Sequence, residues 1–419
     1  MTGNNMDQHA ENIHASQAQA APTKTGMWAI LAVVSVMLMF FAPNYAQFQL
    51  SPLAHEIMPQ FGLDANQFSA LFSAAMIPGI ALSLVAGLMC DRFGTKRTIA
   101  VGGAITVLAL IARIFAPDFI SLFVCMVFAG IVATFVNATT GKIMGAWFDP
   151  SKLGIAVGVA FASGTLAQSV GMGTSALFPS INVLFIFTAA LGIFALVFWM
   201  LFFREGPAGA ENSAGEATTH KPLGECLSVV LKSRNIWILG VALGLCMAVV
   251  MCIATFLPHA LQNVRGFDPA RAGAVASVYT IGSLVGSLFI PVVNARVGRL
   301  KPVVIVLALI AAAGAALGWQ LPEGILMNAV LFVTGVCLGG ILVSLMSVPV
   351  LLPEIGPVYA GTGGGVAATL QLVGAVVVPS YIMTPIIGQN FTVFYLVAGV
   401  LALGAAGAVF LLPEVLKKH

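Results

Sequence analysis

Twelve long apolar segments occupy most of this sequence and leave little polar surface from which a water-soluble fold could be built. A helix needs about 20 predominantly apolar residues to cross the hydrocarbon core of a bilayer. Charged residues make up only 8% of the chain, whereas soluble domains contain about a quarter. The sequence therefore predicts an all-α membrane protein with twelve transmembrane helices in two pseudo-symmetric six-helix bundles. The predicted spans lie near residues 27–48, 66–89, 98–115, 119–142, 153–175, 180–203, 236–258, 270–292, 301–320, 324–347, 359–386 and 391–413.

Three polar stretches divide the apolar ones. The first residues lack the basic start and short apolar core of a signal peptide. A second stretch, rich in Gly, Ala, Ser, Thr and Glu, separates six spans from six. We therefore predict a disordered cytoplasmic tail, a first six-helix bundle, a cytoplasmic linker, a second six-helix bundle and a second cytoplasmic tail, at residues 1–26, 27–203, 204–234, 235–413 and 414–419.

The basic residues predict how the chain is oriented, because Lys and Arg are retained on the cytoplasmic side of a membrane. With the N-terminus inside, 15 of the 18 basic residues fall in cytoplasmic loops and tails, and only Arg113, Arg265 and Arg271 fall outside. We expect a multi-pass protein of the cytoplasmic (inner) membrane with both termini in the cytoplasm. The net charge of +3 gives no indication of nucleic-acid binding.

The two halves of the chain form an internal repeat. At an offset of 204 residues, without a gap, His55 matches His259 and Ser73 matches Ser277, and the match extends to Gly62 and Gly266, Asp64 and Asp268, Ile77 and Ile281, Arg92 and Arg296, and Gly94 and Gly298. Six-helix halves of the same orientation are parallel repeats, which in transporters pack around a cavity near the membrane midplane. A purely structural duplication would give the same pattern, but the repeat favours a transporter.

The loop between the second and third predicted spans carries the most specific motif. It contains Gly87, Asp91, Arg92, Gly94 and Arg97, and it resembles the signature loop of the major facilitator superfamily, Gly-x-x-x-Asp-Arg-x-Gly-x-Lys/Arg-Arg. The second-half loop lacks the acidic residue. The resemblance implies a secondary transporter that works by rocker-switch alternating access.

The resemblance also implies a gate near this loop. Gly87 allows two helices to approach closely. The Asp91 carboxylate can be stabilised by the backbone amides at the start of span eleven, a Gly-rich stretch that begins at Gly361. The expected gating residues are Gly87, Asp91, Arg92, Gly94, Arg97 and Gly361. The alternative is that Asp91 and Arg92 only determine the topology.

No motif indicates an enzyme, a cofactor or a metal site. The Gly run at residues 361–365 lacks the Lys-Ser/Thr of a phosphate-binding loop and follows no strand. Neither H-E-x-x-H nor G-x-S-x-G occurs, and the six cysteines show no C-x-x-C spacing. The expected partners are a small-molecule substrate and the lipid bilayer, with no nucleic acid, and the chain is expected to function as a monomer.

The acidic residues fall only in tails, loops or span ends, although proton-coupled carriers usually place an ionisable group inside the membrane. His55 and His259, at matching outer ends of spans one and seven, are the remaining candidates for proton coupling. The alternative, which we favour, is that both imidazoles are interfacial caps.

Polar residues within the apolar spans are candidates for lining a substrate cavity, because unpaired polar groups are costly in hydrocarbon. The neutral candidates are Asn44, Tyr45, Gln47, Gln49, Asn137, Thr140, Gln168, Tyr279, Thr369 and Gln371. Hydrogen bonding between helices is the alternative role for each Thr. Arg113 and Lys142 are candidates for binding an anion, and the alternative is that these long side chains snorkel to water.

The loop that follows span four, from Trp147 to Gly158, resembles that of organic-anion, oxalate/formate and nitrate/nitrite porters, with its Pro and basic residue displaced. Nitrate and oxalate are disfavoured because spans two, eight and eleven lack the midspan basic residues of those carriers. The sequence therefore predicts a symporter or antiporter for a small metabolite, preferentially an organic anion. An efflux carrier for amphipathic compounds and a transporter-like ligand sensor are the alternatives.

Overall fold

The computed structural model describes residues 26–148, 150–206, 223–352, 354–388 and 390–415. All regular secondary structure in these ranges is helical, because a helix satisfies its own backbone polar groups in a bilayer. The predicted all-α fold is confirmed. Eleven helical stretches in these ranges are long and apolar enough to cross a membrane, and α9 (Pro150–Thr174) occupies the place of the fifth predicted span.

The first half contains nine labelled helices, which correspond to the first six predicted spans and one short connecting helix. They are α2 (Met27–Phe48), α3 (Ala54–Gln60), α4 (Ala65–Ser73), α5 (Ile77–Phe93), α6 (Thr95–Ala112), α7 (Phe119–Ala129), α8 (Ile131–Gly145), α9 and α10 (Ile181–Phe202).

The second half begins with a helix, α12, that has no counterpart among the described helices of the first half. Its helices are α12 (Leu223–Lys232), α13 (Arg234–Arg265), α14 (Pro269–Val297), α15 (Leu300–Leu317), α16 (Ile325–Met346), α17 (Val348–Leu351), α18 (Gly356–Val377), α19 (Thr384–Ile387) and α20 (Phe391–Leu411). Helix α12 lies within the stretch that the sequence predicted as a linker, and its helical structure was not predicted.

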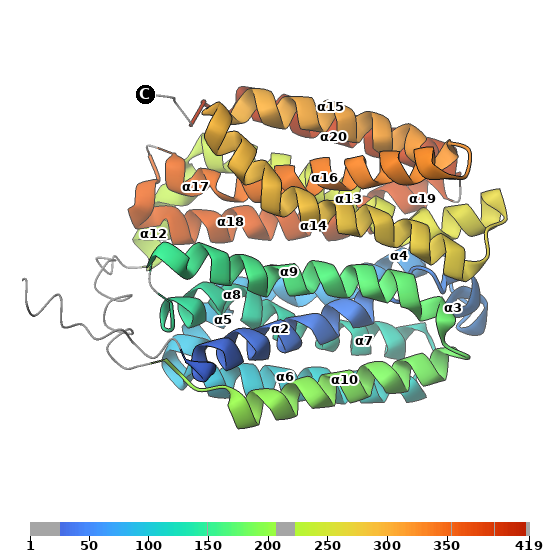
Figure 1. The fold of residues 1–419 in the computed structure, drawn as a ribbon, viewed down its shortest axis with the longest axis horizontal. Helices are drawn as coiled ribbons and strands as arrows, with labels where there is room; N and C mark the ends of the chain where they lie inside the picture. The colour runs from blue at the N-terminus through green and yellow to red at the C-terminus, as the bar shows by residue number, and fades with distance from the viewer. Residues whose placement is uncertain (1–25, 149, 207–222, 353, 389, 416–419) are drawn as a thin grey trace, which may run out of the picture.

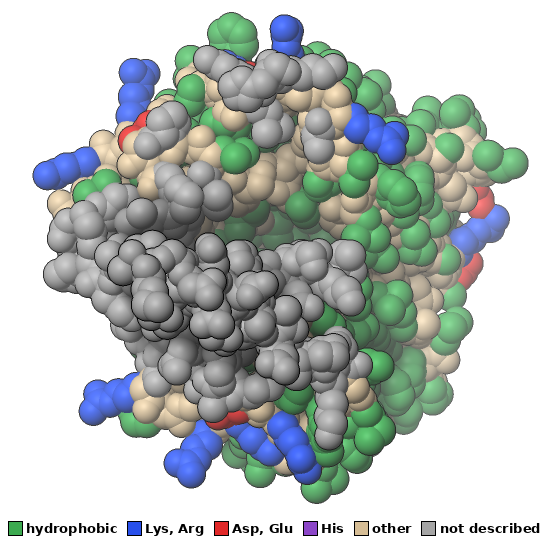
Figure 2. Space-filling model, turned by 60° about the vertical axis from the view of Figure 1, so that its left-hand side comes forward, with side chains coloured by type: hydrophobic (Ala, Val, Ile, Leu, Met, Phe, Trp, Pro, Cys, Tyr) green, Lys and Arg blue, Asp and Glu red, His purple; other side chains and the backbone are tan. Residues whose placement is uncertain are grey.

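The two halves lie side by side, with α9 of the first half against α14 of the second (Figure 1). Helix α2 begins and helix α20 ends at the same end of the molecule. Lys and Arg side chains gather around that end, as Figure 2 shows. We call it the basic end, and we call the end that carries α3 and α19 the opposite end.

Three predicted spans are not single straight helices. The second span runs through α4, a 3₁₀ turn at Ala74–Met76 and α5, and the eleventh contains a π-helical segment at Val378–Met383 between α18 and α19. The fourth span breaks at Gly130, between α7 and α8, where a Cβ atom would collide with the carbonyl of Ala75 in that 3₁₀ turn. The break therefore lets two helical spans approach backbone to backbone.

Small residues allow similar close packing inside the second half. A Cβ atom on Gly282 or Gly286 of α14 would meet the backbone of α16, and one on Gly335 or Gly339 of α16 would meet the backbone of α14. Dispersion contacts between closely packed backbones hold helices together in lipid, where the hydrophobic effect contributes little. The α14–α16 pair is thus a rigid element of the second half.

Candidate functional site

The two halves are joined at the opposite end. The hydroxyl of Ser51 donates to the backbone carbonyl of Thr255 (2.7 Å), and the Gln262 amide donates to the carbonyl of Pro52 (2.8 Å). Ser51 and Thr255 are 204 residues apart, so they are equivalent positions of the repeat. Residues that meet their own repeat equivalents lie on the pseudo-two-fold axis, and the axis therefore passes through this contact.

A cluster of three serines joins α4 to the π-helical segment at the same end. The hydroxyl of Ser380 lies 3.0 Å from that of Ser69 and 2.7 Å from that of Ser73, and it also donates to the carbonyl of Ser69 (3.0 Å). All three side chains are buried. This cluster was not predicted from the sequence; the available signals were the helical spacing of Ser69 and Ser73 and the helix-distorting Pro379 beside Ser380.

Exposed residues on α8, and open space beside α8 and α9, indicate that the halves separate towards the basic end. One face of α8 is exposed there and carries Asn137, Ala138, Gly141 and Lys142. A Cβ atom on Gly141, or on Gly158 of α9, would meet no atom within 4 Å. An amide and an ammonium group are costly against lipid, so this face of α8 faces a water-accessible space.

In the last third of both helices, towards the opposite end, α2 and α9 bring two of the predicted substrate residues together. The amide of Gln168 donates to Asn44 Oδ1 (3.5 Å), and Asn44 Nδ2 donates to the carbonyl of Phe40 (2.8 Å). Both side chains are only partly buried. They therefore keep hydrogen-bonding capacity for a ligand.

Another contact, nearer the basic end than this pair, crosses between the halves. The hydroxyls of Ser83 on α5 and Thr369 on α18 lie 3.4 Å apart, and Gln371 on α18 is partly buried nearby in the chain. Asn44, Gln168, Thr369 and Gln371 thus lie between the packed opposite end and the separated basic end. They form the innermost part of the candidate site, and Asn137 and Lys142 lie nearer the opening.

Other predicted substrate residues are occupied within the first half. Tyr45 pairs with Thr174 (3.1 Å), Gln47 donates to the carbonyl of Phe72 (2.9 Å), and Gln49 accepts from Thr188 (2.7 Å). All three predicted side chains are buried. They connect α2 to its neighbours, so we leave them out of the candidate site.

Thr140 and Tyr279 are also buried and do not reach the site. The Thr140 hydroxyl donates to the carbonyl of Val136 on its own helix (2.6 Å), which is a common way to satisfy a threonine in an apolar helix. Tyr279 is enclosed within the second half, and its hydroxyl has no hydrogen-bond partner among the described residues. Their place in the helices gave no indication of which way they point.

Arg113 does not snorkel to water, and that prediction is wrong. The side chain is 1% exposed, with Nη1 3.4 Å from the carbonyl of Ala46 and the guanidinium 4.3 Å from the centre of the Phe185 ring. Its neighbours Ala46, Met126 and Phe185 all belong to the first half. Arg113 is therefore inside that bundle and away from the space beside α8.

The two predicted proton-coupling residues lie at the opposite end. His259 is buried on α13, where its Nε2 accepts from the Asn263 amide (2.9 Å), and His55 on α3 lies 3.4 Å from Glu56. The two histidines occupy repeat-equivalent positions near the contact of Ser51 with Thr255, and both the capping and the coupling interpretations remain predictions.

The signature loop forms a tight turn between α5 and α6. Gly94 has φ +85°, in the region that L side chains rarely adopt. Arg92 lies over the Phe93 ring (5.4 Å) and Arg97 is exposed. The surroundings of Gly87 and Gly361 and the side chain of Asp91 fall outside what the structure describes. The predicted contact of Asp91 with the start of span eleven therefore stays a prediction.

A polar site between two repeated six-helix halves is the arrangement of a membrane transporter. The chain belongs to the major facilitator superfamily: the model of that family matches residues 25–379. Within the described residues no group of three or more His, Cys, Asp or Glu side chains could hold a metal ion.

Three relatives illustrate the similarity. The chain is 22% identical to the "Probable sulfoacetate transporter SauU" of Cupriavidus necator, over 91% of this chain and 93% of that protein. It is 24% identical to the hexuronate transporter of Bacillus subtilis, over 57% of each chain. Its fold matches the crystal structure of a bacterial homologue of the human lysosomal transporter Spinster, in an inward-facing and unoccupied conformation, with a TM-score of 0.73 and 15% identity over 92% of this chain and 97% of that one.

Proposed function

We propose that this protein is a secondary active transporter that moves a small organic anion across the cytoplasmic membrane by alternating access. The observation that carries the proposal is the exposed polar face of α8, on which Lys142 and Asn137 lie nearer the opening than the Asn44–Gln168 pair. An ammonium group attracts a carboxylate, and neutral amides can bind its remaining oxygens. The relatives' names, which specify sulfoacetate and hexuronate, support an anionic substrate.

The sidedness of the conformation follows from the basic residues. If the basic end faces the cytoplasm, as the positive-inside rule requires, the separated halves are open inwards and the contacts of Ser51 and Ser380 close the outer side. Both termini are then cytoplasmic. The state is the one expected for release of an imported substrate or loading of an exported one.

Uptake by proteoliposomes, measured with a panel of labelled carboxylates, sulfonates and neutral metabolites, tests the proposal. We expect transport of a carboxylate, and we expect Lys142→Gln to raise its KM about tenfold or more, because hydrogen bonds to charged groups contribute about 1.5–3 kcal/mol. Lys232→Gln, which removes an exposed cation from α12 at the same end, is the matched control and should leave KM unchanged. An equal KM in the Lys142 variant would contradict the proposed role.

The same assay separates the alternatives. Flux of amphipathic compounds alone would favour an efflux carrier. Tight binding of a ligand without any flux would favour a sensor. Uptake that depends on a pH gradient and is lost in His259→Gln would favour a role of His259 in proton coupling over a role as an interfacial cap at the opposite end.

A further inference from the structure

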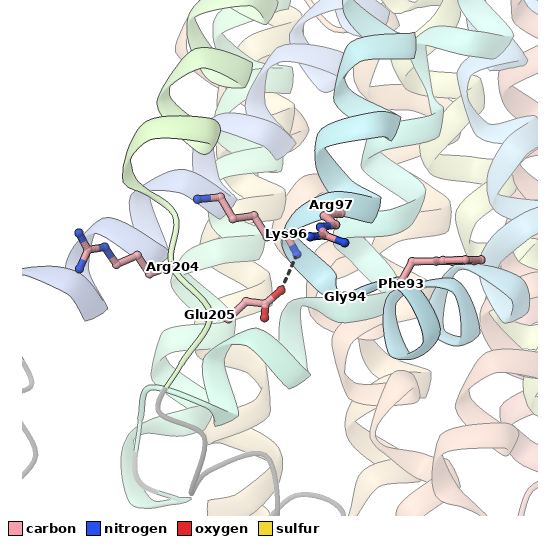
Figure 3. A pocket seen from close by; sticks show the side chains of 6 residues that line it. All are labelled: Phe93, Gly94, Lys96, Arg97, Arg204 and Glu205. Carbon is pink, nitrogen blue, oxygen red and sulfur yellow. Dashed lines mark hydrogen bonds between the residues drawn. The ribbon is translucent and has the colours of Figure 1, made fainter.

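A pocket of about 470 Å³ opens at the basic end of the first half, apart from the space beside α8. It lies between the α5–α6 turn and the end of α10, as Figure 3 shows. Its lining residues are Phe93, Gly94, Lys96, Arg97, Arg204 and Glu205. Three cations and one carboxylate therefore surround it. Of these four side chains only that of Arg97 belongs to the predicted gate, and none takes part in the proposed substrate site.

The carboxylate of Glu205 is already used by the backbone. Its Oε1 accepts from the backbone N–H of Lys96 (3.1 Å), in the first turn of α6, where N–H groups have no partner within the helix. The carbonyl of Lys96 accepts from the indole N–H of Trp199 (3.2 Å), which is buried on α10. The backbone of Lys96 is thus fixed through both its N–H and its carbonyl group.

The cations are not neutralised in return. The side chains of Lys96 and Arg97 form no ion pair within the described part of the chain, and Arg204 lies over the Trp28 ring, 3.6 Å from its centre. Figure 3 shows the Lys96 and Arg97 side chains pointing away from Glu205 to either side. The pocket therefore offers positive charge that no carboxylate among the described residues pairs with.

Apolar side chains continue from the pocket along the membrane-spanning surface. Val101 lies one turn after Arg97 on the same face of α6, and Leu201 lies at the end of α10, three residues before Arg204 in the chain; they are 60% and 66% exposed. Phe93, in the pocket lining, is 55% exposed. Cations at a span end directly above exposed apolar residues match a molecule with a phosphate head and hydrocarbon tails.

The second half provides an internal comparison. Glu414, which follows α20 as Glu205 follows α10, accepts from the backbone N–H groups of Leu300 (2.9 Å) and Lys301 (3.1 Å) at the start of α15. There the equivalent of Lys96 is Leu300, and the residue before the glutamate is Pro413 rather than an arginine. The glutamate cap is thus common to both halves, whereas the three cations are found only in the first. The cap alone therefore does not explain why the cations are there.

From this geometry we infer that the pocket binds the phosphate group of an anionic phospholipid from the leaflet at the basic end. Lys96, Arg97 and Arg204 contact the headgroup oxygens, and Phe93, Val101 and Leu201 lie along the acyl chains. The lipid joins the α5–α6 turn to the end of α10, so its binding stabilises the first half.

Thermal unfolding of the detergent-purified, delipidated full chain tests this inference with phosphatidylglycerol and with phosphatidylcholine. We expect a concentration-dependent rise in Tm with phosphatidylglycerol only, because a ligand that binds the folded state stabilises it by mass action. Each of K96Q, R97Q and R204Q should weaken the apparent affinity for phosphatidylglycerol about fivefold, as expected for one cation near a membrane surface. Lys301→Gln, the charge-matched variant in the second half, should leave the affinity unchanged.

Native mass spectrometry supplies a second readout that does not depend on stability, since retained phosphatidylglycerol can be counted on each variant. Retention by the triple variant K96Q/R97Q/R204Q at the level of the unsubstituted protein would overturn the inference. An equal loss of affinity in Lys301→Gln would show that phosphatidylglycerol binds through nonspecific charge attraction, and it would contradict a specific site. A Tm rise of the same size with inorganic phosphate or glycerol phosphate would identify a soluble phosphate, instead of a lipid, as the ligand.

Discussion

At the residue scale, Arg113 stands out because its charged side chain is buried, whereas most arginines keep their guanidinium in water. Its Nε and Nη2 have no hydrogen-bond partner among the described residues, and Nη1 has two long contacts, with the carbonyl of Ala46 (3.4 Å) and the sulfur of Met126 (3.7 Å). Burial of a charge without a counter-charge costs free energy, and the contact with the Phe185 ring offsets only part of that cost. Arg113 is therefore expected to destabilise the folded protein.

We predict that Arg113→Met raises the Tm of the purified protein by several degrees, because methionine fills a similar volume without a buried charge. The KM for substrate should not change, since Arg113 lies inside the first half. Arg113→Lys keeps the charge and should give no rise. A lower Tm together with a higher KM in Arg113→Met would show instead that the guanidinium supports the substrate site.

At the element scale, the π-helical segment of span eleven determines how the opposite end closes. A π segment inserts an extra residue into a helical turn, and such segments are frequent at functional sites. Here it places Ser380 against both Ser69 and Ser73 of α4. Neutral hydroxyl contacts of this kind are individually weak, so they can break and re-form as the two halves move.

We expect a disulfide between Ser73→Cys and Ser380→Cys to lock this end and stop transport, because the two hydroxyl oxygens are 2.7 Å apart. Reduction should restore transport. The pair Asn294→Cys and Ser344→Cys, which joins α14 and α16 within one half (2.6 Å), is the control and should transport in both redox states. Both pairs belong in a background without the native cysteines, and continued transport by the oxidised Ser73–Ser380 pair would exclude closure at this seam.

At the scale of the whole molecule, the two halves meet at one end and separate at the other. If the closed end opened while the open end closed, a bound substrate would be released on the other side of the membrane. The contacts that close the opposite end come from both halves and include repeat-equivalent positions. Among the glycines beside open space, Gly141, Gly158 and Gly364 lie towards the basic end, on α8, α9 and α18. Rigid-body rocking of one half against the other, around the site between them, can interchange these arrangements.

Cysteine labelling in sealed vesicles tests this arrangement and its sidedness. Gly158→Cys, whose Cβ would meet no atom within 4 Å, should react with a membrane-impermeant maleimide only in inside-out vesicles. Gly173→Cys, whose Cβ would lie 3.5 Å from Ser277 at the packed end, should react poorly from both sides. Labelling of Gly158→Cys only in right-side-out vesicles would reverse the proposed orientation.

The sequence by itself determined the all-helical membrane fold, its two repeated halves and its family. These are properties of long stretches of chain: apolar length selects a spanning helix wherever it occurs, and a repeat is visible without any contacts. The tertiary structure decided which polar side chains are available. Hydropathy does not identify the face of a helix that meets a neighbour, so Gln47 and Gln168 looked equivalent until packing buried the first against Phe72 and left the second partly exposed beside Asn44. The burial of Arg113, the serine cluster and the cap formed by Glu205 join residues far apart in the chain, and only the packing of the helices brings those residues together.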